Sequence, residues 1–111
     1  MTTPDAARVV VIGGGITGVS VAYHLARAGW RDIVLLEKGE LTSGSTHHAA
    51  GLVTQLHPSA TMMEFRRYSV SLYRELGVFN TVGSVRIASS PDSFADLRRA
   101  ASRSLALGLV V

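Results

Sequence analysis

A glycine-rich segment near the N-terminus has the residue types and spacing of a phosphate-binding turn. Gly13, Gly15 and Gly18 form a Gly-x-Gly-x-x-Gly motif directly after a short apolar run. In such a motif the first glycine allows a tight turn, the second lets a pyrophosphate approach the backbone, and the third lets a helix pack closely on a strand. The helix that follows offers free N–H groups, such as those of Ile16 and Thr17, to the phosphates.

An acidic residue stands where a ribose-binding carboxylate is expected. Glu37 follows a second apolar run and lies nineteen positions past Gly18. Its side chain can accept hydrogen bonds from the ribose hydroxyls of an adenosine. A carboxylate there would repel a 2′-phosphate, which argues against NADP, while the neighbouring Lys38 could pair with a phosphate or remain in water. These residues predict dinucleotide binding and leave the choice between NAD and FAD open.

The elements that must position these residues are a strand, a helix and a second strand. Residues 8–12 and 33–36 are short apolar runs, typical of parallel strands buried on both faces. Apolar residues at helical spacing lie between them, and Gly29 is a plausible end of the helix. The sequence therefore predicts an α/β fold, with a Rossmann-like βαβ unit over residues 8–38.

The remainder of the chain predicts further elements. Residues 41–56 are rich in Ser, Thr, Gly and His, so we expect a loop. The apolar spacing predicts a helix over 60–76, and alternation over 83–89 predicts a half-buried strand. Ser90 and the proline after it predict the start of another helix.

The last residues, 109–111, are apolar and predict the start of a strand. Because a single βαβ unit also leaves its strand edges uncovered, we expect residues 1–111 to be part of a larger domain.

The amino-acid composition limits the size of the domain and the kinds of chemistry that this protein can perform. The chain has 111 residues, a net charge of +3, 47% hydrophobic residues and no cysteine. These values suit one small domain and exclude disulfides and thiol catalysis. Residues 1–7 do not resemble a signal peptide, and the apolar runs are too short to span a membrane, so we expect a cytoplasmic protein without membrane contact.

Two other kinds of binding site are disfavoured. The eleven Lys and Arg residues are scattered and form no basic and aromatic stripe, which argues against nucleic acid as a partner. His47, His48 and His57 have no carboxylate at ligand spacing, which argues against a metal site.

The segment Ser-Gly-Ser-Thr-His-His-Ala-Ala-Gly over residues 43–51 identifies a resemblance. Together with the glycine motif and Leu36-Glu37-Lys38, it resembles the N-terminus of the sarcosine and dimethylglycine dehydrogenase group. That group belongs to the D-amino-acid-oxidase-like FAD-dependent oxidoreductases. The resemblance implies that residues 1–111 are the N-terminal part of a glutathione-reductase-type FAD domain. In this arrangement residues 41–56 wrap toward the flavin, and residues 60–111 hold a helix and the start of the substrate-domain sheet.

The resemblance also implies a cofactor, a reaction and partners. It implies FAD, bonded in several members to a histidine that corresponds to His48. The implied reaction is oxidation of the C–N bond of a secondary or tertiary amine, such as dimethylglycine or sarcosine. The partners would be that small-molecule amine and an electron acceptor, either an electron-transfer flavoprotein or oxygen.

The implied cofactor-binding residues lie in the glycine turn, at the end of the second strand and in the loop after it. They are Gly13, Gly15, Ile16, Thr17, Gly18, Glu37, Lys38, Gly44, Ser45, Thr46, His47, His48, Ala49, Ala50, Gly51 and Leu52.

No residue is assigned as catalytic or as a metal ligand, and the isolated chain is expected to be inactive. Two alternatives stay open. One is a non-catalytic, truncated remnant that at best binds a dinucleotide. The other is an NAD-linked dehydrogenase, which would have no use for the loop around His48.

Overall fold

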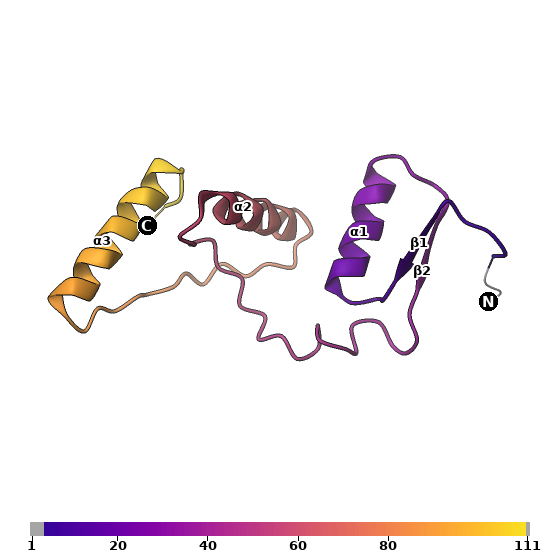
Figure 1. Ribbon diagram of the computed structural model, residues 1–111, viewed down its shortest axis with the longest axis horizontal. Coiled ribbons are helices and arrows are strands. Elements are labelled where there is room, and N and C mark those ends of the chain that lie inside the picture. The colour runs from indigo at the N-terminus through magenta and orange to yellow at the C-terminus, as the bar shows by residue number, and fades with distance from the viewer. Residues whose placement is uncertain (1–3, 111) are drawn as a thin grey trace. The chain divides into compact units, whose positions relative to one another are not determined.

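The computed structural model of the chain describes residues 4–110 (Figure 1). The chain forms two compact units, one ending at Gly51 and the other beginning at Leu52. No helix within residues 4–110 combines the length and the hydropathy that crossing a membrane requires.

The first unit is a two-stranded parallel sheet with one helix. Its elements are β1 (Val9–Ile12), α1 (Ile16–Arg27) and β2 (Ile33–Leu36). The register runs from Val9 opposite Ile33 to Ile12 opposite Leu36, and α1 contacts both strands. This arrangement confirms the predicted α/β fold with a Rossmann-like βαβ unit.

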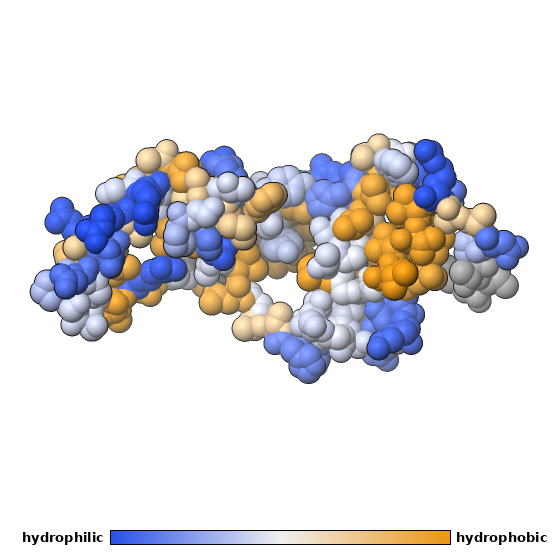
Figure 2. Space-filling view, in the orientation of Figure 1, coloured by the Kyte–Doolittle hydropathy of each residue, from blue (hydrophilic) through white to orange (hydrophobic). Residues whose placement is uncertain are grey.

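The strands are less buried than their apolar sequences predict. Val10 is 51% exposed, Ile12 86% and Leu36 41%, so the expectation of strands buried on both faces is wrong for this structure. Figure 2 shows the hydrophobic residues gathered over β1 and β2. The reason is that residues 4–51 contain a single helix, and one helix covers one face of a sheet.

The second unit contains two helices, α2 (Ala60–Glu75) and α3 (Pro91–Ala106), which confirms both predicted helices. The buried apolar side chains of this unit are Met63, Val70, Leu72 and Leu109. Arg67 Nη1 on α2 donates to the carbonyl oxygen of Leu107 at 3.2 Å and so ties α2 to the end of α3.

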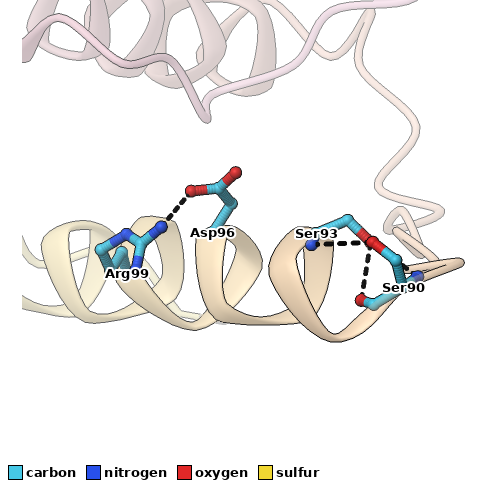
Figure 3. Close-up of polar contacts among 4 residues, drawn as sticks. All are labelled: Ser90, Ser93, Asp96 and Arg99. Atoms are coloured by element: carbon cyan, nitrogen blue, oxygen red, sulfur yellow. Dashed lines mark hydrogen bonds and ion pairs between the residues drawn. The ribbon is translucent and has the colours of Figure 1, made fainter.

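The N-terminus of α3 is held by a reciprocal pair of serines (Figure 3). The Ser93 N–H donates to Ser90 Oγ at 3.2 Å, and the Ser90 N–H donates to Ser93 Oγ at 3.0 Å. With Pro91 at the first helical position, the start of the helix is as predicted. The Asp96–Arg99 ion pair one turn later is exposed and therefore contributes little to stability.

The strand predicted over 83–89 is not formed. Those residues have no regular secondary structure, and Val85 and Ile87 are 88% and 90% exposed. A strand needs a partner to satisfy its backbone N–H and C=O groups, and the sheet of residues 4–110 consists of β1 and β2 alone. Leu109 and Val110 also form no strand, and Val111 lies outside the described residues.

Close contact between the glycine turn and α1 depends on Gly18. A Cβ at this position would lie 1.9 Å from the carbonyl oxygen of Gly13 and 3.3 Å from Val11 Cγ1. Gly13 itself has a φ of +103°, which favours glycine. The third glycine of the motif therefore sets how closely α1 approaches β1.

We expect Gly18→Ala to lower the free energy of unfolding by about 1–3 kcal/mol or more, because the added methyl group forces backbone atoms apart. Urea denaturation followed by far-UV circular dichroism measures this change. Gly44→Ala is the matched control, since a Cβ there meets nothing within 4 Å. Equal stability of the two variants would contradict the close-packing role of Gly18.

Candidate dinucleotide-binding site

Gly14, the middle residue of the glycine turn, joins three parts of the first unit. It is buried, and its N–H donates to Glu37 Oε2 at 2.7 Å. Its carbonyl oxygen accepts from the N–H of Thr42 at 3.1 Å. A Cβ on Gly14 would lie 2.5 Å from Leu41 Cδ2, so any larger residue here would displace the Leu41 side chain. The end of β1, the end of β2 and the following loop thus meet at one residue.

Glu37 is held as a carboxylate by backbone N–H groups. The hydrogen bond from Gly14 is the main cause that lowers its pKa from the ordinary 4.5, and a bond from the Gly39 N–H to Oε1 at 3.0 Å is the next. The backbone and the charge of Lys38 lower the pKa further, whereas partial burial opposes them. Each carboxylate oxygen retains acceptor capacity for a hydroxyl group.

The N-terminus of α1 is capped by a residue from the distant loop. Gly15 occupies the N-cap position and has no side chain to accept a hydrogen bond. Instead, the Ile16 N–H donates to Thr46 Oγ1 at 2.9 Å. The resemblance implies Thr46 as a cofactor-binding residue, and the structure places its hydroxyl at the first N–H of the helix, where a phosphate would bind.

The loop after β2 folds on itself through its backbone. The His47 N–H donates to the carbonyl oxygens of Thr42 and Gly44, at 3.0 and 3.1 Å. Thr42 adopts a φ of +67°, which is uncommon for a residue other than glycine. The rings of His47 and His48 lie edge to face, 5.7 Å apart, and both residues are exposed. The loop therefore holds both imidazoles at the surface of the first unit.

The structure brings together part of the predicted set. Hydrogen bonds and close approaches connect the glycine turn with Ile16, Glu37 and Thr46. The other predicted residues of this unit are exposed and are not linked to the turn by these contacts: Thr17, Lys38, Gly44, Ser45, His47, His48, Ala49, Ala50 and Gly51. Leu52 belongs to the second unit.

Sequence reasoning missed Gly14 and the capping role of Thr46. The run of three glycines at 13–15 was the available signal for Gly14, since a residue between two motif glycines is otherwise unconstrained. Nothing local predicts the Thr46 cap, because thirty residues separate it from Ile16. Within residues 4–110 no His, Asp or Glu side chains gather in a way that could hold a metal ion.

Comparisons with known protein families, sequences and structures find related proteins. Residues 8–111 match the DAO family, described as FAD dependent oxidoreductase. The chain is 50% identical to dimethylglycine dehydrogenase of Rattus norvegicus over 79% of its length, and 40% identical to sarcosine dehydrogenase of Homo sapiens over 96%. Its structure resembles glycine oxidase from Bacillus cereus with a TM-score of 0.68 and 25% identity, over 89% of the chain.

The chain covers a small part of each relative. It spans 11% of the dimethylglycine dehydrogenase, 12% of the sarcosine dehydrogenase and 30% of the glycine oxidase chain. The similarity therefore concerns the region that contains the glycine turn and the loop after β2.

Acid should remove the contribution of Glu37 to stability. A carboxyl whose folded pKa is lowered stabilises the fold fully above its unfolded pKa, near 4.5, and loses that contribution as pH falls through the folded pKa. We therefore expect the difference in unfolding free energy between the wild type and Glu37→Gln to be largest near neutral pH and to shrink in acid. Urea titrations across this pH range measure it. Glu40→Gln, which leaves the Gly14 bond intact, is the control, and parallel curves for Glu37→Gln would contradict the prediction.

Thr46→Val should expose the N-terminus of α1. The substitution keeps the shape of the side chain and removes the acceptor for the Ile16 N–H, so we expect a loss of about 1 kcal/mol in stability. Hydrogen exchange of the Ile16 amide should also accelerate, which NMR measures directly. Thr46→Ser keeps the hydroxyl and should behave as wild type, as should Ser45→Ala. Unchanged exchange at Ile16 in the valine variant would show that Thr46 is not the cap.

Proposed function

The chain belongs to the DAO family of FAD-dependent oxidoreductases, and on this premise we propose that it holds the adenosine diphosphate half of FAD in an amine-oxidising enzyme. The proposed reaction is oxidation of the C–N bond of a secondary or tertiary amine, with dimethylglycine and sarcosine as the first candidates. Support comes from the names of the relatives, which include dimethylglycine dehydrogenase and sarcosine dehydrogenase.

The residues of the first unit fit a dinucleotide. Gly18 lets α1 begin close to β1, so the first N–H groups of the helix and its positive dipole end face the same turn. Those groups suit a pyrophosphate, and the Thr46 hydroxyl beside Ile16 can donate to a phosphate oxygen. The ionised Glu37 suits the ribose hydroxyls. The bond from Gly14 to Glu37 carries the proposal, because it fixes the carboxylate beside the turn.

Bound FAD would supply an acceptor for the hydride that leaves the carbon next to the amine nitrogen. The contribution of this chain is positioning. Glu37 orients the ribose through a carboxylate that its backbone partners keep ionised. The helix N-terminus offsets the charge of the phosphates. An electron-transfer flavoprotein or oxygen is the proposed final acceptor, and the cytoplasmic location stays a prediction.

His48 is the proposed attachment point if the flavin is covalently bound. A neutral imidazole can act as a nucleophile toward an activated carbon. Both His47 and His48 are exposed on the loop, so either ring is accessible. His48 is preferred because it directly precedes the Ala-Ala-Gly segment.

The test uses the protein expressed from its complete reading frame. After acid precipitation, we expect flavin fluorescence in the washed pellet of the wild type and of His47→Ala, and its loss from the pellet of His48→Ala. Flavin in the supernatant of the wild type would contradict covalent attachment and retain FAD as the cofactor. Absence of flavin from both fractions would contradict the proposed function and favour a non-catalytic remnant.

A further inference from the structure

The second unit contains a small hollow with a basic lining, which the proposed flavin site does not use. Its volume is about 40 Å³. Three parts of the chain that are distant in sequence form it: the segment before α2, the segment before α3, and α3 itself. The lining residues are Leu56, His57, Pro58, Arg86, Ala100 and Arg103.

The polar side chains of this lining supply hydrogen-bond donors. Arg86 and Arg103 carry guanidinium groups, which only donate. His57 Nδ1 accepts from the Ser59 N–H at 3.1 Å, so the proton of a neutral ring lies on Nε2. His57 is therefore a donor as well.

Two backbone acceptors of the lining residues already have partners. The Leu56 carbonyl oxygen accepts from Arg66 Nη1 at 2.9 Å, and the Ala100 carbonyl oxygen accepts from Ser104 Oγ at 2.8 Å. The lining includes no carboxylate. The hollow thus combines cationic, donor side chains with a lining that contains no carboxylate.

The ion pairs described within residues 4–110 are formed by arginines other than the two of the lining. Arg67 pairs with Glu64, and Arg99 pairs with Asp96. Arg86 and Arg103 are exposed and line the same hollow, so an oxyanion bound there can accept hydrogen bonds from both side chains.

We propose that this hollow is a binding site for a small oxyanion of the phosphate or carboxylate class. The planar guanidinium fork matches both groups, because it presents paired N–H donors to two oxygens. Roughly 10–15 Å³ suffices for one water molecule, so the hollow has room for a small oxyanion and is too small for a nucleotide. This site lies in the second unit and is independent of the flavin.

The experiment titrates the full chain, without flavin, with inorganic phosphate at constant ionic strength set by chloride. Phosphate binding is followed by isothermal titration calorimetry and by NMR shifts of the Arg103 and His57 amides. We expect Arg86→Gln and Arg103→Gln each to weaken binding by roughly tenfold or more, because each removes a charge-assisted pair of hydrogen bonds. Sodium acetate in a parallel titration distinguishes a carboxylate site from a phosphate site.

Matched variants separate a built site from general attraction. Arg98→Gln removes the same charge from α3 at a position outside the lining and should leave the affinity unchanged. Arg86→Lys retains the charge and the fold while losing the fork, so intermediate affinity supports the proposal. No binding of either anion, or equal weakening by Arg98→Gln, would overturn it. Because no flavin is present, neither result bears on the proposed oxidoreductase function.

Discussion

The hydrogen bond from the Gly14 N–H to Glu37 is the interaction on which the first unit depends. It joins the turn after β1 to the residue that follows β2, and the carbonyl of the same glycine receives the Thr42 N–H. A Cβ at position 14 would lie 2.5 Å from Leu41 Cδ2 and 3.2 Å from Glu37 Cβ, so glycine lets both side chains pack against this peptide without displacement. The parallel sheet, the turn and the loop are consequently aligned by one buried peptide.

The sequence alone predicts the site residues whose roles depend on local backbone geometry. Gly13 and Gly18 were predictable because a turn with positive φ and a close helix approach admit no Cβ, and the spacing of the motif reports both constraints. Glu37 was predictable from its position at a strand end. The Thr46 cap was not, because no local pattern marks which hydroxyl of a Ser/Thr-rich loop will reach a helix thirty residues earlier.

The apolar sequence patterns predict that strand side chains are buried, but several of these side chains are exposed in the structure. Ile12 and Val85 belong to segments with strand-like sequences, and each is more than four-fifths exposed. A hydrophobic pattern specifies which side chains favour a core, whereas the partner that forms the core is a long-range feature. Residues 9–12 form a strand because they pair with β2. Residues 83–89 form none, because no strand among residues 4–110 is paired with them.

The placement of charge around the turn follows from what the turn must bind. An aspartate at an N-cap would satisfy a helix N-terminus well, yet it would repel a phosphate brought to the same N–H groups. Here the cap is the neutral hydroxyl of Thr46, and the N-cap residue itself is Gly15. The carboxylate of Glu37 is instead bound at Gly14, toward the strand end. Negative charge is thus kept from the helix N-terminus and retained where hydroxyl donors are expected, which is the division that a pyrophosphate joined to a ribose requires.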